Sequence, residues 1–229
     1  MGKSIKTRYG DFYFRPYEEQ DESGILCLWE AAFGQKLSVK TWRWKFRDNP
    51  LGRRMMVCFT ESGQPVSLYS GIPYRANFNG DEVHLIHLMD NMSHPAFRFA
   101  VSGRMGLYGL TVNHFVSMVS GDEKSIASFG FPGDRHFRLG KLQFRYHKIT
   151  PGVAFLKGEI NELKPGKRPF LRKAELAESS GEMFNILWQR SQSYYPFSVI
   201  RDARFIGWRY FSRPVFRYKI GRASCRERV

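Results

Sequence analysis

The sequence lacks any apolar run of about 18 residues, so we expect no membrane span. Residues 1–8 are polar and basic and contain no apolar signal core. Only 3 cysteines occur in 229 residues, which argues against a disulfide framework. Cys27 and Cys58 lie in apolar patterns and fit reduced core positions. These absences predict a cytoplasmic protein that does not contact a membrane.

Acidic residues are also scarce, with 21 Asp and Glu against 36 Lys and Arg, which gives a net charge of +15. Such a charge suits a polyanionic partner such as DNA, RNA or a lipid surface, or the phosphates of a cofactor. The basic residues are spread along the chain and form no continuous block. This spread favours a solvated basic surface, and a basic nucleic-acid-binding module stays as the less favoured alternative.

The last ten residues, 220–229, read IGRASCRERV and resemble the translation of a common sequencing adapter. We therefore expect a natural chain that departs from this sequence near Lys219. Without the three arginines and one glutamate of this tail, the net charge falls from +15 to +13. The alternative is a genuine basic tail, disordered by its composition.

Alternating and apolar patterns predict a sheet with a parallel crossover. Three of the strands form an antiparallel meander, with turns at Ser62-Gly63 and Asn79-Gly80. Helices are expected after Asp21 or Ser23, ending at Gly34, and after Ser38. The expected strands are residues 9–15, 55–60, 66–74, 83–89, 125–131 and 142–149, and the later helices are residues 103–119 and 135–140.

A glycine-spaced turn follows the apolar strand of residues 83–89. Gly103 and Gly106 stand three apart near the start of a helix, with Arg98 and Arg104 beside them. Helix N-termini attract anions, and glycine lets a phosphate approach the backbone closely. The pattern predicts an anion site here, although a plain strand-to-helix connection gives the same pattern.

An aromatic motif occurs twice. Trp44-Lys45-Phe46 with Pro50 matches Trp208-Arg209-Tyr210 with Pro214 in spacing, and a Trp-bearing helix precedes each. The match indicates a duplicated fold whose second copy is incomplete, or a chance likeness between aromatic-rich segments.

Together these elements resemble the GNAT superfamily of acyl-CoA-dependent N-acyltransferases, over about residues 9–149. Arg98 to Gly103 is similar to the family's turn R/Q-x-x-G-x-G/A, with Val101 at the central glycine, and Gly103-Arg104-Met105-Gly106 offers a second register. The segments of residues 94–98 and 130–140 are also similar to motifs of this family. Residues 42–46, which read W-R-W-K-F, and residues 49–52, which read N-P-L-G, resemble the W-x-W-K-F and N-P-x-G signature of a tandem GNAT subgroup.

The resemblance implies an α+β fold with a mixed, mostly antiparallel sheet flanked by helices, followed by a partial second GNAT-like half. It implies domains at residues 1–150 (acyltransferase), 151–172 (linker), 173–219 (start of a second half) and 220–229 (tail). It also implies acetyl-CoA or another acyl-CoA as cosubstrate. The expected cofactor-binding residues are Met92, Ser93, Arg98, Val101, Gly103, Arg104 and Gly106.

The implied activity is transfer of an acyl group, with acetyl expected, to an amine of a small molecule or a protein. Asp90 is the candidate general base, and its alternative role is a capping or bulge-stabilising carboxylate. His136 is the candidate acid, since Phe137 stands where many members have a tyrosine. No metal site is expected, because His84 and His87 face opposite sides of a strand. Val101 and Phe137 favour the alternative of a catalytically silent CoA-binding relative.

Overall fold

The structure is a computed structural model that describes residues 3–7, 9–101, 105–149 and 172–225. Gly103, Arg104, the expected linker up to residue 171 and residues 226–229 lie outside the described part. The chain forms two compact units, residues 1–132 with 180–217, and residues 133–179 with 218–229. Each unit is described by itself.

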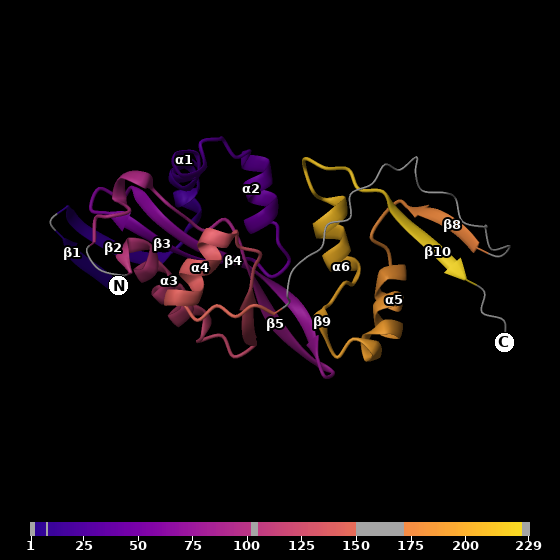
Figure 1. Cartoon of the computed structure of the whole chain (residues 1–229). Helices are drawn as coiled ribbons and strands as arrows, with labels where there is room; N and C mark the ends of the chain where they lie inside the picture. Colours follow the sequence, from indigo (N-terminus) through magenta and orange to yellow (C-terminus); the bar gives the residue numbers. More distant parts are fainter. Residues whose placement is uncertain (1–2, 8, 102–104, 150–171, 226–229) are drawn as a thin grey trace. The chain divides into compact units, whose positions relative to one another are not determined.

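The first unit is built on a mixed sheet (Figure 1). Its path is β1 (Lys3–Thr7), β2 (Gly10–Pro16), β3 (Arg54–Thr60), β4 (Pro65–Phe78), β5 (Asp81–Leu88) and β7 (Ser125–Phe129). Neighbours on this path are antiparallel except β5 and β7, which are parallel. Two short strands, β6 (Met92–Ser93) and β9 (Phe197–Val199), also pair with β4. The predicted sheet, mostly antiparallel with one parallel crossover, is confirmed.

Helices cover both faces of this sheet. The helices α1 (Glu22–Phe33) and α2 (Val39–Phe46) pack with Leu68 and Ile72 of β4 in the main apolar core. On the other face, Phe115 of α3 (Gly106–Val119) meets Tyr69 edge-on, with ring centroids 4.9 Å apart. Leu68 and Tyr69 are neighbours in β4, so they point to opposite faces of the sheet. Two short helices, η1 (Glu19–Asp21) and η2 (Pro95–Phe97), precede α1 and α3.

The helix end and the hairpin turn lie at the residues that the sequence predicts. Gly34 ends α1 with φ of 71°, and Asn79 and Gly80 have φ of 54° and 104° in the β4–β5 hairpin. These left-handed conformations suit glycine and asparagine. The strand β1 was not predicted, because its own residues are mostly polar and it gains its pairing only from β2.

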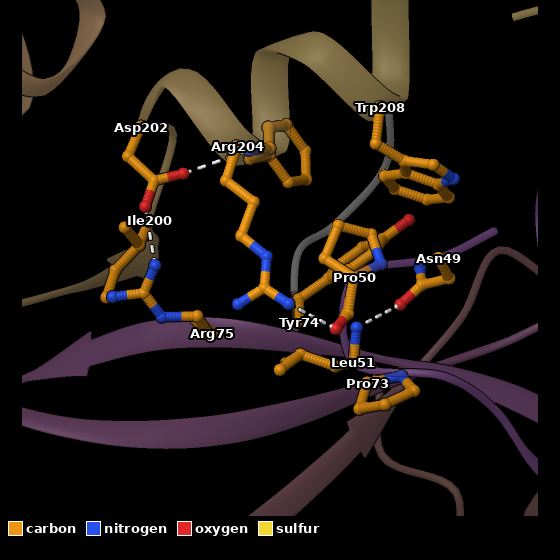
Figure 2. A pocket seen from close by; sticks show the side chains of 11 residues that line it. Asn49, Pro50, Leu51, Pro73, Tyr74, Arg75, Ile200, Asp202, Arg204 and Trp208 are labelled. Carbon is orange, nitrogen blue, oxygen red and sulfur yellow. Dashed lines mark hydrogen bonds and ion pairs between the residues drawn. The ribbon is translucent and has the colours of Figure 1, made fainter. Parts of the chain in front are cut away.

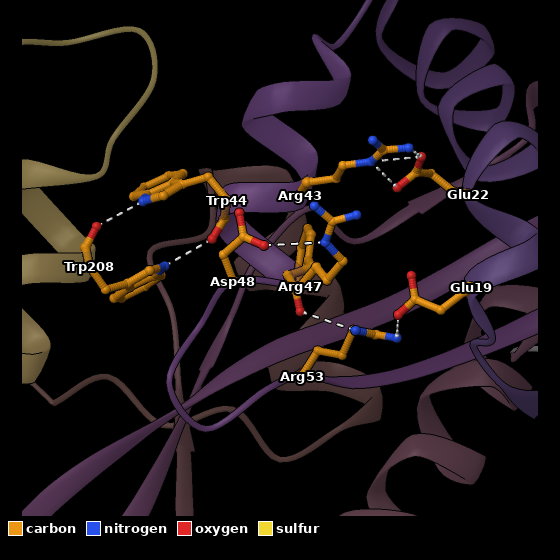
Figure 3. A network of polar contacts seen from close by, with 9 residues as sticks. Glu19, Glu22, Arg43, Trp44, Arg47, Asp48, Arg53 and Trp208 are labelled. Carbon is orange, nitrogen blue, oxygen red and sulfur yellow. Dashed lines mark hydrogen bonds and ion pairs between the residues drawn. The ribbon is translucent and has the colours of Figure 1, made fainter.

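The remaining part of the first unit carries α5 (Met183–Ser191), η4 (Gln192–Tyr194), α6 (Ala203–Ile206) and a π-helix, η5 (Gly207–Phe211). Trp208 in η5 and Trp44 in α2 hold this part against the first helices (Figure 3). Each indole Nε1 donates to the other residue's carbonyl at 2.8 Å. The two rings stack with centroids 5.4 Å apart. The two tryptophans of the sequence repeat are thus partners in a reciprocal contact.

Ion pairs fix α2 on its outer side (Figure 3). Arg43 donates to both carboxylate oxygens of Glu22 in α1, and these hydrogen bonds lower the pKa of Glu22. Arg53 reaches the carboxylate of Glu19 and stacks on the Tyr17 ring. The position of α2 is therefore set by both its buried aromatic face and its charged face.

The second unit contains α4 (Asp134–Gln143) and an antiparallel pair of β8 (Arg172–Ala177) and β10 (Ile220–Cys225). The strand predicted at residues 142–149 is wrong. Helix α4 extends to Gln143, because the Phe144 amide still donates to Gly140. Arg145 then adopts φ of 55°, which a strand cannot accommodate. No helix in the described part of either unit is long and apolar enough to cross a membrane.

Candidate active site at the bulge between β5 and β6

The candidate site is built around a bulge at the end of β5. Leu88 pairs with Gly71 of β4, and Met92 pairs with Leu68. Three residues, 89–91, therefore face two residues of β4, which is a β-bulge. A bulge redirects the strand and re-aims its side chains, so it separates β5 from β6.

Side chains hold the bulge in place. Asn91 Oδ1 accepts the Ser70 amide at 2.7 Å and so replaces the missing backbone acceptor. Ser70 Oγ donates to the Met89 carbonyl, and the Met89 amide donates to the Ser70 carbonyl at 3.1 Å. Ser70 is fully buried, so leaving these groups unpaired would be costly.

Asp90 stands at the turn of the bulge with φ of 56°. Its Oδ2 lies 2.5 Å from Nζ of Lys45 in α2, and both side chains are largely buried. The structure thus places this predicted catalytic residue at the bulge, in an ion pair that ties α2 to the sheet. No pattern in the sequence indicates that Lys45 is its partner.

Beyond the bulge, one edge of β6 is open. The parallel β5–β7 ladder extends only to the pair of His87 with Phe129. Among the described strands, β6 pairs with β4 alone. The His94 amide donates to Val66 of β4 at 2.8 Å, so the Ser93 amide points to the opposite, open edge. Met92 instead has its side chain in the core, with 4% exposed.

The predicted phosphate turn begins with η2. His94 caps this helix, its Nδ1 accepting the Ala96 amide at 3.2 Å, so His94 shapes the turn. Gly106, at the start of α3, has φ of 54°, and a Cβ there would lie 3.5 Å from the Arg98 carbonyl. The loop thus returns to bring Gly106 beside Arg98. Val101 lies partly buried just before the undescribed residues Gly103 and Arg104.

His136 lies in α4 of the second unit. Its ring stacks on Tyr146, with centroids 6.1 Å apart, and burial lowers its pKa. A Cβ on Gly140 would overlap the Tyr146 ring at 2.2 Å, which explains the glycine in the Leu-Gly motif. The proposed role of His136 as an acid stays a prediction.

The structure brings a different histidine close to the bulge. His87 lies three residues before Asp90, and its Nδ1 is 3.1 Å from the Tyr74 hydroxyl. Its ring stacks on Phe129 at 4.7 Å with an interplanar angle of 6°. Burial, and then the positive charges of Arg209 and Lys45, lower the pKa of His87 to about 4. The imidazole is therefore neutral at neutral pH.

Lys45 and Arg209 occupy equivalent positions in the sequence repeat, each directly after its tryptophan. The positive charges of both residues contribute to lowering the pKa of the His87 imidazole. The repeat is visible in the sequence, but the effect of its two basic residues on the pKa of His87 depends on the tertiary structure. In the part of the chain that the structure describes, no cluster of His, Cys, Asp and Glu suits a metal ion.

A separate crevice lies where residues 200–208 meet β4 and the turn after α2 (Figure 2). Its polar groups bond mainly to one another. Arg204 Nη2 donates to the Pro50 carbonyl at 2.6 Å, and the Leu51 amide donates to Asn49 Oδ1 at 2.9 Å. Asp202 pairs with Arg75 and caps α6. We interpret this crevice as a packing seam.

Comparisons with known proteins agree with the fold. A family model of the acetyltransferase (GNAT) domain matches residues 13–105. A search of curated proteins finds no match. Among solved structures, the fold is similar to a protein of unknown function from Enterococcus faecalis V583, described as a probable N-acyltransferase. The TM-score is 0.65 and the identity 13%, over 93% of this chain and 51% of that chain.

The fold is also similar to Saccharomyces cerevisiae N-myristoyltransferase, in a structure with bound myristoyl-CoA. Here the TM-score is 0.53 and the identity 12%, over 91% of this chain and 52% of that chain. The chain thus spans about half the length of these two relatives. Residues 13–105 thus match the acetyltransferase (GNAT) domain in sequence, and the fold is similar to that of the probable N-acyltransferase from Enterococcus faecalis V583.

Proposed function

We propose that this chain transfers an acyl group, with acetyl expected, from acyl-CoA to an amine of a small molecule or a protein. The observation that carries the proposal is the open edge of β6, where the Ser93 amide points away from β4 directly after a bulge. The family match to residues 13–105 supports it.

The residues at this edge fit an acyl-CoA. Its pantetheine arm is an extended amide chain, and an open strand edge offers amides and carbonyls to such a chain. Arg98 and the α3 N-terminus at Gly106 lie together and suit a diphosphate. Arg98, Val101, Gly103, Arg104 and Gly106 are the residues that we assign to the phosphates. Met92 and Ser93 are assigned to the thioester end.

When bound, acyl-CoA supplies an activated carbonyl and a thiol leaving group. We assign the Ser93 amide to the carbonyl oxygen, where it would stabilise the developing negative charge. The amine nitrogen forms a bond to the carbonyl carbon while the bond from that carbon to sulfur breaks. The amine proton passes to a base, and the sulfur leaves as a thiol after it takes up a proton.

We assign the base to Asp90 Oδ1, since Oδ2 is paired with Lys45. Asp90→Asn is a suitable test, because asparagine tolerates the left-handed φ of 56° and keeps the shape of the bulge. Loss of a general base lowers kcat by about 10²–10⁴-fold. If kcat of Asp90→Asn decreased by less than about fivefold and its pH profile were unchanged, Asp90 would only stabilise the bulge. His136 is the proposed acid.

Thermal-shift titration with CoA thioesters tests the binding step, and thiol release with a panel of amines tests the chemistry. The double variant Arg98→Glu with Arg104→Glu should abolish the shift caused by acetyl-CoA. The matched control is Lys6→Glu with Arg190→Glu, the same charge change at two exposed positions of the first unit. Equal binding by both double variants would refute the assignment of the turn. Binding without thiol release would favour the silent relative.

We also propose that residues 173–219 begin a second GNAT-like half, after a linker at residues 151–172. The reciprocal contact of Trp44 and Trp208 supports this, because duplicated segments commonly pair about a local two-fold axis. The assignment of residues 220–229 to an adapter stays a prediction.

A further inference from the structure

A largely buried ion pair joins Lys45 of α2 to Asp90 in the bulge. The distance from Nζ to Oδ2 is 2.5 Å, and only 18% and 13% of the two side chains are exposed. A carboxylate that is removed from water and lacks a cation takes up a proton, because its charged form loses its solvation. The charge on Asp90 therefore depends on Lys45, and so does its ability to accept a proton from an amine.

The position of the Lys45 ammonium is fixed by α2 and by two aromatic rings. Trp42, Trp44 and Phe46 anchor α2 in the apolar core. The Nζ atom lies 5.8 Å from the centre of the Trp29 ring and 5.7 Å from that of the Phe46 ring. Both rings attract a cation through their π-electrons, so they limit where the ammonium can lie. The ammonium therefore has little freedom to follow a carboxylate that moves.

The backbone of Asp90 is fixed as well, by hydrogen bonds on both sides of it. Met89 exchanges hydrogen bonds with Ser70, and Asn91 Oδ1 accepts the Ser70 amide. The side-chain torsions of Asp90 are the freedom that remains, and the contact of Oδ2 with Lys45 restricts them. No residue in the described part of the chain donates a hydrogen bond to Oδ1. One carboxylate oxygen is therefore held, and the other is available.

We propose that Lys45 is a positioning residue for acyl transfer, because its ammonium keeps Asp90 ionised and holds Oδ2 while Oδ1 accepts the amine proton. This inference rests on the proposed acyl transfer with Asp90 as its base. Of the groups that flank the pair, Trp29 of α1 does not titrate. His87, three residues earlier on β5, is neutral at neutral pH, because burial and the positive charges of Arg209 and Lys45 lower its pKa to about 4. A change in activity near neutral pH is therefore attributed to Asp90.

The experiment measures how the rate of thiol release from acetyl-CoA depends on pH. The same amine, the most active of the panel, is used with every variant, so the ratio of variant to wild-type kcat/KM removes the ionisation of the amine. Lys45→Met removes the cation but keeps an unbranched apolar chain. We expect this ratio to fall as the pH is lowered, because the acid limb of the profile moves to higher pH by about 1–3 units. The KM for acetyl-CoA should not change, since Lys45 acts on the base and not on the cosubstrate.

Further variants separate the charge of Lys45 from its position. Lys45→Arg keeps the charge, so the acid limb should stay in place even where kcat is lower. Lys45→Gln keeps a hydrogen-bond donor without the charge and should move the limb as Lys45→Met does, so it provides the test if Lys45→Met does not fold. In an Asp90→Asn background, Lys45→Met should have no further effect on kcat. Lys40→Met, at an exposed lysine of the same helix, is the matched control.

Three results would overturn the proposal. The first is an acid limb that stays in place in both Lys45→Met and Lys45→Gln. The second is an equal shift in Lys40→Met. The third is an equal loss of kcat on Lys45→Met with and without the Asp90 carboxylate, which would mean that Lys45 does not act through Asp90.

A measurement that needs no activity separates this proposal from the acyl transfer. The carboxyl carbon of Asp90 is followed by NMR in protein isotope-labelled at aspartate, and its signal is identified by its absence in Asp90→Asn. The signal should titrate at higher pH in Lys45→Met than in the wild type. This result without thiol release from any amine would support the control of Asp90 by Lys45, and the acyl transfer alone would then fail. Thiol release with an unmoved titration would refute the role of Lys45 and leave the acyl transfer standing.

Discussion

The reciprocal contact of Trp44 and Trp208 predicts two substitutions of equal cost. Trp208→Phe removes the Nε1 donor to the Trp44 carbonyl but keeps the backbone carbonyl that accepts from Trp44. Trp44→Phe does the same in the opposite direction. Each variant therefore loses one buried hydrogen bond of 2.8 Å and keeps the other.

The expected loss of stability in the two variants follows from the burial of both tryptophans. The two residues are 4% and 5% exposed, so the abandoned carbonyl stays in an apolar environment in either variant. An unsatisfied buried acceptor costs about 1–3 kcal/mol. The smaller ring leaves a gap that costs about 1 kcal/mol more. We expect each single variant to lower the free energy of unfolding by about 2–4 kcal/mol, and the two values to agree within about 0.5 kcal/mol.

Urea unfolding followed by far-UV circular dichroism measures both values. Trp188→Phe is the control, because Trp188 is a half-buried tryptophan on α5 outside the pair, and its cost should stay below about 1 kcal/mol. A large cost for Trp44→Phe with almost none for Trp208→Phe would refute the reasoning. That result would mean that residues 180–217 are not anchored on the first helices through this pair.

Three further predictions concern the bulge and its surroundings. Asn91→Ala removes the acceptor of the buried Ser70 amide and should lower stability by about 1–3 kcal/mol in urea unfolding. Gly71→Ala places a Cβ 2.5 Å from the Ile86 side chain, so it should lower the thermal midpoint by overpacking that costs about 1–3 kcal/mol. His87 has a pKa lowered from 6.5 to about 4, so the unfolded state takes up its proton first as the pH falls. The contribution of His87 to the free energy of unfolding is therefore largest above pH 6.5. It decreases by about 2 kcal/mol, after allowance for solvent screening, as the pH falls towards 4.

Matched variants control these three results. Asn113→Ala changes an exposed asparagine on α3, and Gly121→Ala meets only an ordinary contact at 3.6 Å. Both should be nearly neutral. His87→Gln should flatten the difference in stability between pH 7 and pH 4.5. An unchanged acid dependence in that variant, or Asn91→Ala as stable as Asn113→Ala, would contradict the respective prediction.

Several parts of the fold were predictable because their causes are local. Gly34 and Asn79-Gly80 adopt left-handed conformations that few other residues tolerate, so they mark a helix end and a hairpin in the sequence itself. The apolar strand, the parallel crossover and the helix after Gly106 follow from periodicity. The strand expected at residues 142–149 failed for the opposite reason. Its alternating pattern was overridden by helix α4 and by the packing of Tyr146 on Gly140.

The sequence by itself determined the GNAT resemblance, the end of the apolar strand at Asp90 and the presence of a repeated Trp-basic-aromatic motif. Only the tertiary structure decided what these residues contact. Trp44 and Trp208 are 164 positions apart, and Asp90 is 45 positions from Lys45. The same holds for the joint effect of Lys45 and Arg209 on the pKa of His87. Such pairings depend on how helices dock on a sheet, and burial then sets the protonation of His87, so neither follows from spacing along the chain.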